Sequence, residues 1–332
     1  MEDFDLLFKH IENIKVAIIG DVMLDTYWWG KVERISPEAP VPIVAIDKKE
    51  HRLGGAGNVA LNAVSLGAKT TLFSVIGQDD NAKLLIDILN NERIETKYII
   101  CSTNRITTNK TRVISRNQQM MRLDTEITND ISDEDENNLL QQLQIYIQTE
   151  QPSVVIFEDY NKGVLTESLI HKAIDICKKN GIVTAVDPKR KHFFAYRQTD
   201  IFKPNLKEVK DALNVLLEDT SEQNLNLMHQ QLHEFLQHKI SLITLSEKGL
   251  FFQEENFSKI IPTHIRNIAD VSGAGDTVIA VASLVYAASK NITLAAEMAN
   301  LAGGLVCEEV GTAAIKKEKL LRECKLVFAS AG

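Results

Sequence analysis

The chain has 332 residues, of which 44% are hydrophobic and 25% charged, so it can bury a large core in one α/β domain or in two smaller ones. A net charge of −8 argues against a nucleic-acid-binding surface, no apolar run reaches the roughly 18 residues that suggest a membrane span, and the acidic N-terminus lacks a signal-peptide apolar region. Four widely spaced cysteines form no CxxC pair, so we expect a cytoplasmic protein without a zinc knuckle or disulfide framework.

The first elements in chain order are typical of an α/β fold. Residues 4–11 predict a short helix, and the apolar run from Val16 to Ile19 predicts a strand that closes at Gly20 and Asp21. Ligands of open α/β sheets bind beyond the carboxyl ends of the strands. Asp21 and the nearby Asp25 are therefore candidates for a binding site.

Two segments predict a small accessory sheet. From Trp28 to Ile46, short β-like stretches are interrupted by prolines, which suits edge strands or loops. Residues 106–123 predict a hairpin that turns near Arg116 and Asn117. We expect segments at about 28–48 and 104–124 to project as a lid from a single domain that spans residues 1–332.

After Gln151 the chain alternates predicted strands and helices, which indicates a parallel sheet with helices on both faces. The predicted strands are Val154–Phe157, Val183–Val186, Ile201–Phe202 and Leu242–Leu245. Polar groups follow each strand and should meet in one crevice, and they are Glu158 with Asp159, Asp187, Asn205 with Glu208, and Ser246 with Glu247. The expected fold class is α/β, with a doubly wound, mostly parallel sheet flanked by helices and a β-sheet lid.

The segment DVSGAGDT, residues 270–277, carries the strongest chemical signal, and a helix-compatible apolar run follows it. Gly273, Ala274 and Gly275 have little side chain, so their N–H groups can approach a phosphate at a helix N-terminus, where the helix dipole favours negative charge. Asp276 falls in the first turn, where its carboxylate could accept a proton from a hydroxyl group beside the transferring phosphoryl group. The alternative is a helix start that merely prefers Asp and packs tightly through its glycines.

Together with other motifs, this segment resembles signatures of the ribokinase family, also called the phosphofructokinase-B family. DVSGAGDT is similar to the family's C-terminal signature, and GGAGN at residues 54–58 is similar to its N-terminal glycine signature. The resemblance implies that Asp276 is the catalytic base and that the amides of residues 273–275 stabilise the phosphoryl group. Asn205 and Glu208 match the family's NxxE motif, which implies that they order Mg²⁺ around the phosphates of ATP. Taken alone, that motif is also typical of a capped helix start.

The N-terminal half resembles one branch of that family, the heptose 7-phosphate kinases. The segments SPEAPVPI and RNQQ carry this narrower resemblance, which extends through almost all of the chain. It implies ATP-dependent phosphorylation of D-glycero-β-D-manno-heptose 7-phosphate at its anomeric hydroxyl, in the pathway to ADP-heptose and the lipopolysaccharide core. Many such relatives carry a nucleotidyltransferase with an HxGH motif. The sequence has no HxGH, so we expect only the kinase activity.

The resemblance also implies where the sugar binds. Asp21, Asp25 and Asn58 offer oxygen and amide groups that suit vicinal hydroxyls. Gly54 and Gly55 would let the backbone approach the sugar closely. These five residues are the predicted sugar contacts.

Four further residues are candidate contacts to phosphate groups. Lys110 and Arg112 lie two apart on a predicted strand, so they share one face and could meet the 7-phosphate. Their alternative role is to protect an exposed sheet edge. Asp159 and Lys162 could lie near the substrate phosphates, although a loop Asp–Lys pair is often a surface feature of little energetic value.

The nucleotide site is the least specific part of the resemblance. Its implied residues are Ser246, Glu247, Gly249, Asn300 and Lys189. Family members often bind a monovalent cation such as K⁺, which the resemblance implies near Asp270 and Gly311. ATP and Mg²⁺ are the expected co-substrate and metal.

Two other functions compete with a sugar kinase. Residues 55–60 also fit the dinucleotide fingerprint GxGxxA, which would indicate an NAD-dependent oxidoreductase, but the first predicted strand ends some 35 residues earlier, at Asp21. A non-catalytic sugar- or nucleotide-binding regulator is the second alternative, and the retained Asp276 argues against it. Neither a Walker A motif nor the protein-kinase HRD and DFG motifs occur.

Two further features of the sequence concern metal binding and the oligomeric state. His229 and His233 have the spacing of a metal-binding pair, but they lie on a polar amphipathic helix where we expect solvated positions. The lid sheet should have exposed edges that pair between subunits, so a homodimer is expected.

Overall fold

The computed structural model describes residues 3–116, 118–215, 219–264 and 266–329. The strands of its main sheet are β1 (Lys15–Gly20), β4 (Lys69–Ile76), β5 (Ile99–Cys101), β8 (Val154–Glu158), β9 (Val183–Asp187), β10 (Ile201–Phe202), β11 (Ile240–Thr244), β12 (Leu250–Glu254) and β13 (Phe257–Ile261). They are ordered β13-β12-β11-β10-β9-β8-β1-β4-β5. Neighbours pair in parallel from β11 through β5, and only β12 and β13 join antiparallel.

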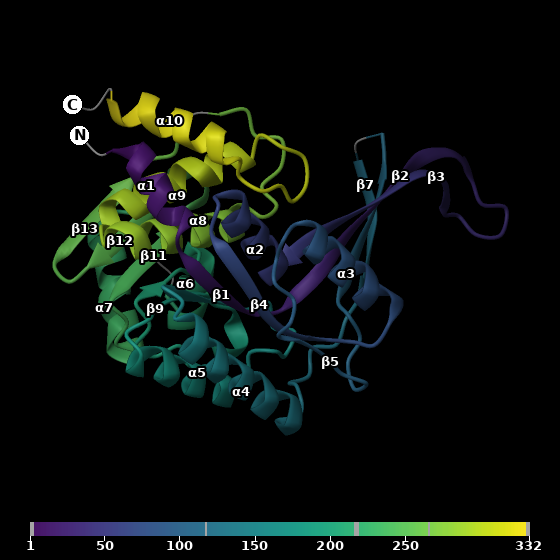
Figure 1. The fold of residues 1–332 in the computed structure, drawn as a ribbon. Coiled ribbons are helices and arrows are strands. Elements are labelled where there is room, and N and C mark those ends of the chain that lie inside the picture. The colour runs from purple at the N-terminus through teal and green to yellow at the C-terminus, as the bar shows by residue number, and fades with distance from the viewer. Residues whose placement is uncertain (1–2, 117, 216–218, 265, 330–332) are drawn as a thin grey trace.

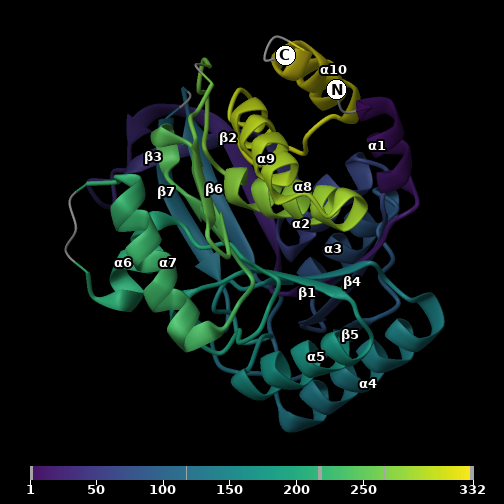
Figure 2. The same cartoon turned by 90° about the vertical axis from the view of Figure 1, so that its left-hand side faces the viewer.

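Helices cover both faces of this sheet, as the alternation predicted (Figure 2). Their bounds are α1 (Phe4–Glu12), α2 (Ala56–Ser65), α3 (Asp80–Asn91), α4 (Asp133–Glu150), α5 (Glu167–Lys179), α6 (Leu206–Leu213), α7 (Glu222–Leu236), α8 (Ala274–Ser289), α9 (Ile292–Val306) and α10 (Lys317–Ala329). Alternate residues of β1 enter different cores, because successive side chains of a strand point to opposite faces. Val16 and Ile18 belong to the core with α1, α2, α8 and α9, whereas Ala17 and Ile19 belong to the core with α4, α5 and α7.

Both ends of the described chain lie on the same side of the body, where α1 meets α10 (Figure 1). The rings of Phe4 and Phe328 stack with centroids 5.5 Å apart, and Lys325 pairs with Asp5 at 2.7 Å. No helix of the described residues is long and apolar enough to cross a membrane.

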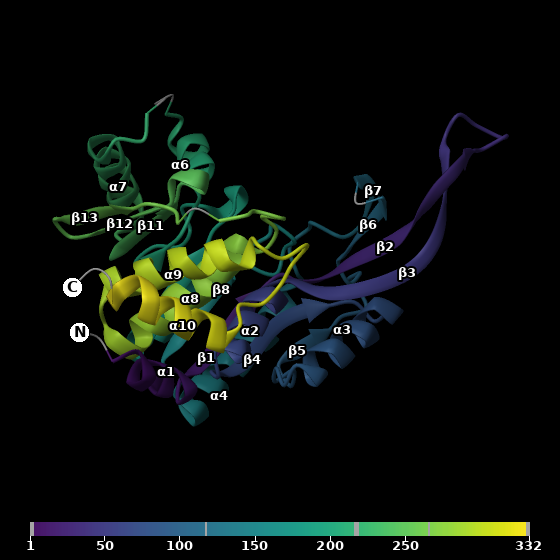
Figure 3. The same cartoon turned by 90° about the horizontal axis from the view of Figure 1, so that it is seen from above.

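The predicted lid is a second sheet with the order β3-β2-β6-β7. Its strands are β2 (Val22–Ile35), β3 (Pro42–Gly55), β6 (Asn109–Ser115) and β7 (Gln118–Thr125). Figure 3 shows β2 and β3 extending from the body as one long hairpin. The lid is confirmed, but the prediction of short stretches is wrong: both strands have 14 residues, because the interruption falls in the turn at 36–41.

Pro42 is the first residue of β3, an edge strand, where a missing backbone donor does no harm. The predicted hairpin of 106–123 is confirmed as β6 and β7. Arg116 has a φ of 50°, in the left-handed region typical of a tight turn. Asn117, the other residue predicted at that turn, lies outside the described residues.

The prediction of solvated histidines on α7 is confirmed for His233, which is exposed, but is wrong for His229. His229 is 6% exposed, because α7 packs this side onto the main sheet, and its Nδ1 lies 2.9 Å from Oγ of Ser241. Nε2 of the fully buried His238 lies 2.6 Å from the same oxygen. Burial lowers the pKa of His229 to about 4 and that of His238 to about 3.

These two histidines should make the fold less stable below neutral pH. In the unfolded chain a histidine takes up a proton near pH 6.5, whereas the folded protein keeps both groups neutral down to about pH 4 and about pH 3. Each histidine should therefore lower the free energy of unfolding by about 1.4 kcal/mol per pH unit below 6.5, or about 3 kcal/mol for the pair at pH 5.5.

Urea denaturation at pH 7.5 and 5.5 measures this effect. The variant His238→Asn should lose about half of the pH dependence, while replacement of the exposed His10 by Gln should leave it unchanged. A free energy of unfolding that is equal at the two pH values would contradict the prediction.

Candidate active site

The first turn of α8 opens towards the carboxyl ends of the central strands. Gly273 is the residue before the helix and has a φ of 79°, a left-handed conformation that favours glycine. A Cβ atom there would lie 2.7 Å from Nδ2 of Asn58, so the space also requires glycine. The first N–H groups of a helix have no acceptor within the helix, so this end can bind an anion. The Ala274 N–H donates to the carbonyl oxygen of Val271 before the helix, at a long distance of 3.3 Å.

Asp276 follows in the same turn and is 3% exposed. Its Oδ2 accepts a hydrogen bond from Nδ2 of Asn58 at 2.7 Å, and its Oδ1 accepts one from the hydroxyl of Tyr160 at 2.9 Å. Burial raises the pKa of Asp276 above its ordinary value, against the hydrogen bond from Asn58 that lowers it. The carboxylate is thus held in one orientation and is a better proton acceptor than an exposed aspartate.

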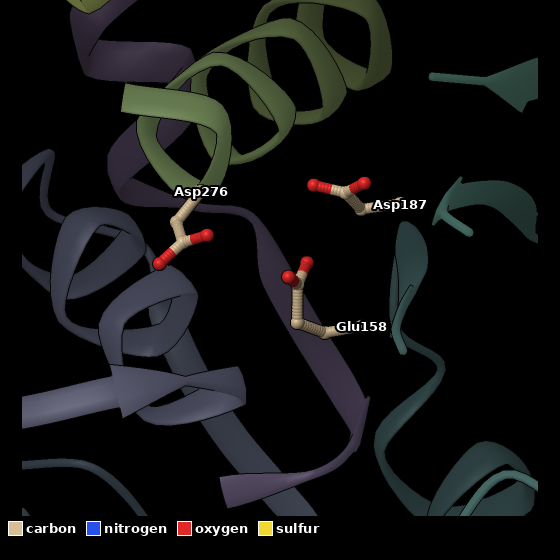
Figure 4. Close-up of side chains that lie close together, drawn as sticks. All are labelled: Glu158, Asp187 and Asp276. Atoms are coloured by element: carbon tan, nitrogen blue, oxygen red, sulfur yellow. The ribbon is translucent and has the colours of Figure 1, made fainter. Parts of the chain in front are cut away.

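Two more carboxylates converge on Asp276, as Figure 4 shows. Glu158 ends β8 and Asp187 ends β9, and an oxygen from each of the three residues lies within 4.8 Å of the other two. The sequence placed Glu158 and Asp187 at strand ends that should share a crevice, and the structure confirms this. Neither was assigned a role, because the spacing along the chain does not show which strand ends are neighbours.

Lysines neutralise only part of this acidic group. Asp187 pairs with Nζ of Lys203 at 2.8 Å and with Nζ of Lys189 at 3.4 Å. Burial raises the pKa of Asp187, but the two ammonium groups outweigh it and hold the pKa below its ordinary value. Glu158 is fully buried, and neither of its carboxylate oxygens has a hydrogen-bond partner among the described residues. Burial, aided by the charges of Asp187 and Asp276, raises the pKa of Glu158 well above its ordinary value.

Asn205 and Glu208, the predicted metal-ordering pair, cap α6. Oδ1 of Asn205 accepts the Glu208 N–H at 2.9 Å, and Oε2 of Glu208 accepts the Asn205 N–H at 2.8 Å. The other carboxylate oxygen of Glu208, Oε1, accepts a hydrogen bond from Nζ of Lys189 at 2.8 Å. The Asn205–Glu208 pair is the capped helix start that the motif also predicts, and the structure confirms it. Lys189 links this cap to Asp187, and a metal-ordering role for the pair stays a prediction.

A cavity of about 550 Å³ adjoins the first turn of α8. Its lining contains four of the five residues that the resemblance implied for the nucleotide, together with Ala274 and Gly275, and these four are Ser246, Glu247, Gly249 and Asn300. Lys189, the fifth, lies beside Asp187 instead. The cavity therefore leads from the predicted nucleotide residues to the predicted phosphate site.

Of the predicted sugar residues, Asn58 contacts Asp276 directly, and the two carboxylates, Asp21 and Asp25, bind protein groups. Asp21 is 1% exposed and its carboxylate accepts the backbone N–H groups of Tyr160, Lys162 and Val164 at 2.8, 3.0 and 3.1 Å. Asp25 of the lid strand β2 forms an ion pair with Arg112 of the neighbouring lid strand β6. Asp21 thereby fixes the loop after β8, and Asp25 joins two strands of the lid.

Close packing against Asp25 and Asp21 requires glycine at positions 54 and 55. A Cβ atom on Gly54 would lie 2.5 Å from Oδ2 of Asp25, and one on Gly55 would lie 2.4 Å from the carbonyl oxygen of Asp21. Gly55 also has a φ of 56°, in the left-handed region. The structure thus explains both glycines by the protein's own packing, and an approach to sugar stays a prediction.

Both structural alternatives for the phosphate candidates are wrong. Lys110 and Arg112 do not protect a sheet edge, because β6 lies between β2 and β7. Asp159 is buried and accepts the Tyr196 hydroxyl at 2.8 Å, and Lys162 pairs with Glu126 at 2.8 Å with only 15% of its side chain exposed. Burial raises the pKa of Asp159 to about 6.

The sequence is similar to known proteins over most of its length. The profile described as pfkB family carbohydrate kinase matches residues 13–319. The chain belongs to the pfkB family of carbohydrate kinases. The expected family and fold class are thereby confirmed, and the oxidoreductase alternative is wrong: residues 55–60 follow a lid strand, not the first strand of the parallel sheet.

Two relatives of this pfkB-family chain share the name Bifunctional protein HldE. The one from Geobacter sulfurreducens is 36% identical over 321 residues, which cover 96% of this chain and 65% of that protein. The one from Aliarcobacter butzleri is 41% identical over 298 residues, which cover 90% of this chain and 62% of that protein. The chain thus spans less than two thirds of the length of these relatives.

Solved structures confirm the fold of the pfkB-family chain. Phosphofructokinase-2 from Escherichia coli in complex with potassium superposes with a TM-score of 0.77 at 16% identity, covering 93% of this chain and 97% of that chain. Arabidopsis thaliana ribokinase complexed with ribose and ATP superposes with a TM-score of 0.73 at 16% identity, covering 93% and 99%. As a carbohydrate kinase, the protein is a phosphotransferase that uses ATP and a sugar.

Proposed function

We propose that this kinase phosphorylates the anomeric hydroxyl of D-glycero-β-D-manno-heptose 7-phosphate, giving the 1,7-bisphosphate for ADP-heptose and lipopolysaccharide-core synthesis. The observation that carries the chemistry is the buried Asp276 beside an open helix N-terminus and a nucleotide-sized cavity. Support for the substrate comes from the segments SPEAPVPI and RNQQ and from the similarity to the HldE proteins. The reaction needs ATP, so we place the protein in the cytoplasm.

In the proposed reaction Asp276 takes the proton of the sugar hydroxyl while that oxygen forms a bond to the γ-phosphorus of ATP. The bond from this phosphorus to the β–γ bridging oxygen breaks, and ADP leaves. Asn58 keeps the carboxylate facing the acceptor through its 2.7 Å hydrogen bond. The amides of residues 273–275 bind the transferring phosphoryl oxygens, so that positioning and charge stabilisation supply most of the acceleration. The lid would exclude water from the site when it closes on the sugar.

The acidic group suits Mg²⁺. Glu158 offers two buried oxygens that lack protein partners, and carboxylate oxygens are the ligands that this hard cation prefers. Glu158 and Asp187 would hold the metal, whose charge would offset that of the ATP phosphates. Glu208 and Asn205 would act from one layer further out, through Lys189, which contacts both Glu208 and Asp187.

We also place a monovalent cation near Asp270 and Gly311. Oδ2 of Asp270 accepts the Gly311 N–H at 2.9 Å, and Oδ1 accepts the Ser272 N–H at 2.9 Å, so this carboxylate joins two loops next to Gly273. Burial works against the ionised form, but hydrogen bonds from Ser272 hold the pKa of Asp270 below its ordinary value. A fixed negative charge here would favour K⁺ as a partner.

The proposed homodimer would form through the lid of a second copy. Several large apolar side chains are exposed on the lid strands and their turn, among them Ile35, Val41, Met120, Met121 and Leu123. Light scattering at micromolar concentration should give about twice the mass of the chain, and replacing Met121 and Leu123 by Lys should shift the protein towards monomer. A monomeric wild-type protein would contradict the proposed dimer.

A panel of sugars tests the function. ADP release should be fastest with D-glycero-β-D-manno-heptose 7-phosphate and much slower with unphosphorylated heptose, ribose or fructose 6-phosphate. Faster turnover of another sugar would reassign the substrate while leaving the kinase chemistry in place. The absence of ADP release with every sugar phosphate would contradict the function.

A further inference from the structure

Tyr160 lies among residues that the sequence predicts to bind the sugar. Its Cδ2 lies 3.4 Å from the point where a Cβ atom on Gly55 would be. Its ring centre lies 5.2 Å from Nζ of Lys110 on the lid and 5.4 Å from Nζ of Lys189 beside the acidic group. The ring therefore lies between the body, the lid and the predicted phosphate site.

The hydroxyl of Tyr160 covers one oxygen of the base. It donates to Oδ1 of Asp276 at 2.9 Å, while Asn58 donates to Oδ2 at 2.7 Å. A sugar hydroxyl must reach one of these two oxygens before it can give up its proton.

Of the two donors, Tyr160 is the less buried. Asn58 is fully buried in the first turns of α2, and its Nδ2 lies 2.7 Å from where a Cβ on Gly273 would be. Tyr160 is only partly buried and belongs to a loop, although its backbone N–H is tied to Asp21 at 2.8 Å. Rotation of the Tyr160 side chain can expose Oδ1 without disturbing the backbone.

We propose that Tyr160 is a gate that the sugar displaces: its phenol occupies Oδ1 of Asp276 while the site is empty and yields this oxygen to the acceptor hydroxyl. The exchange replaces one O–H donor with another at the same carboxylate oxygen, so no covalent bond changes. Tyr160 is thus a positioning residue, and the inference rests on the proposed role of Asp276 as the base.

The gate has two consequences for specificity. While the phenol donates to Oδ1, it occupies one of the acceptor positions of this oxygen and restricts the approach of water, which limits ATP hydrolysis in the absence of sugar. When the ring leaves, Lys110 loses its aromatic contact and becomes available to an anionic group at the lid, whereas Lys189 stays paired with Glu208 and Asp187. A sugar that carries its own phosphate at the lid end should therefore displace Tyr160 better than a free sugar does.

The variant Tyr160→Phe keeps the ring and removes the hydroxyl. We expect sugar-independent ATP hydrolysis to rise and the Kd for sugar phosphate, measured by calorimetry, to fall, each by about threefold to tenfold, which is the value of one net hydrogen bond. kcat for sugar phosphorylation should stay within about threefold of wild type, because the phenol has left the base by then.

Tyr146→Phe is the control, because it removes the hydroxyl of a buried tyrosine in the core with α4, away from the base and the predicted substrate contacts. It should leave sugar-independent ATP hydrolysis unchanged. The gate is overturned if Tyr160→Phe leaves both ATP hydrolysis and the Kd unchanged, or if it lowers kcat more than tenfold without raising ATP hydrolysis.

The Asp276→Asn variant, tested in parallel, distinguishes failure of the proposed base from failure of the proposed gate. If Asp276→Asn turns over normally, the proposed base is wrong and the gate has no function to serve. If Asp276→Asn is inactive while Tyr160→Phe behaves as wild type, only the gate is wrong.

Discussion

Replacing Asp276 with Asn is expected to lower kcat by about 10²–10⁴-fold, the range that a positioned general base contributes. The amide has the shape of the carboxylate, so it can still accept the Asn58 hydrogen bond that now reaches Oδ2 at 2.7 Å. It cannot take a proton from the sugar. Binding of ATP and sugar should therefore stay nearly unchanged, and the loss should appear in kcat rather than in KM.

Steady-state ADP release, together with calorimetric binding of ATP, measures this effect. Asp200→Asn is a suitable control, because Asp200 is a partly buried carboxylate that accepts the Thr184 N–H at 2.8 Å just before β10, at the opposite end of the sheet. That control should retain kcat within about twofold, as expected for a residue outside the site. Near-normal turnover of the Asp276→Asn variant would show that Asp276 is not the catalytic base.

Replacing Lys203 with Met is expected to abolish turnover and to lower the free energy of unfolding by about 3–5 kcal/mol, the cost of breaking a buried ion pair. The Lys203 side chain is 3% exposed and its Nζ lies 2.8 Å from Oδ2 of Asp187. Without this ammonium group, the ion-pair partner that Asp187 keeps among the described residues is Lys189, at 3.4 Å, while Glu158 and Asp276 lie close by. The acidic group would then repel the phosphates of ATP.

The pH dependence of unfolding identifies the cause. In the wild type the pKa of Asp187 is lowered, so this residue contributes stability above its unfolded pKa, near pH 4, and loses the contribution as the pH falls further. The difference in the free energy of unfolding between wild type and Lys203→Met should thus become smaller below about pH 4. Lys239→Met is the control, because Lys239 forms a half-exposed pair with Glu254 and should cost no more than about 1 kcal/mol. Equal free energies of unfolding for Lys203→Met and Lys239→Met would contradict the stabilisation assigned to the buried pair of Lys203 and Asp187.

The sequence predicted the features of this fold that depend on short stretches of chain. The apolar runs at β8 and β9 form strands because both faces of the sheet are covered, and the glycine-rich segment before Asp276 forms a helix start because Gly273 adopts a left-handed conformation. Four of the predicted nucleotide residues line one cavity, because each follows a strand or lies on a helix at the same edge of the sheet.

Partnerships between distant segments could not be predicted in this way. Arg112 and Asp25 are 87 residues apart, and their ion pair depends on the parallel pairing of β2 with β6. The burial of Glu158 and its proximity to Asp276 depend on where α8 packs across the sheet. Tyr160 carries no motif that marks it as a partner of the base, because only the fold of its loop around Asp21 brings its hydroxyl there.

A crystal structure with a non-hydrolysable ATP analogue and Mg²⁺ tests the central claim most directly. The terminal phosphate should lie within hydrogen-bonding distance of the amides of residues 273–275 and beside the carboxylate of Asp276, with the adenine in the cavity that contains Asn300. A terminal phosphate bound away from the start of α8 would contradict the account.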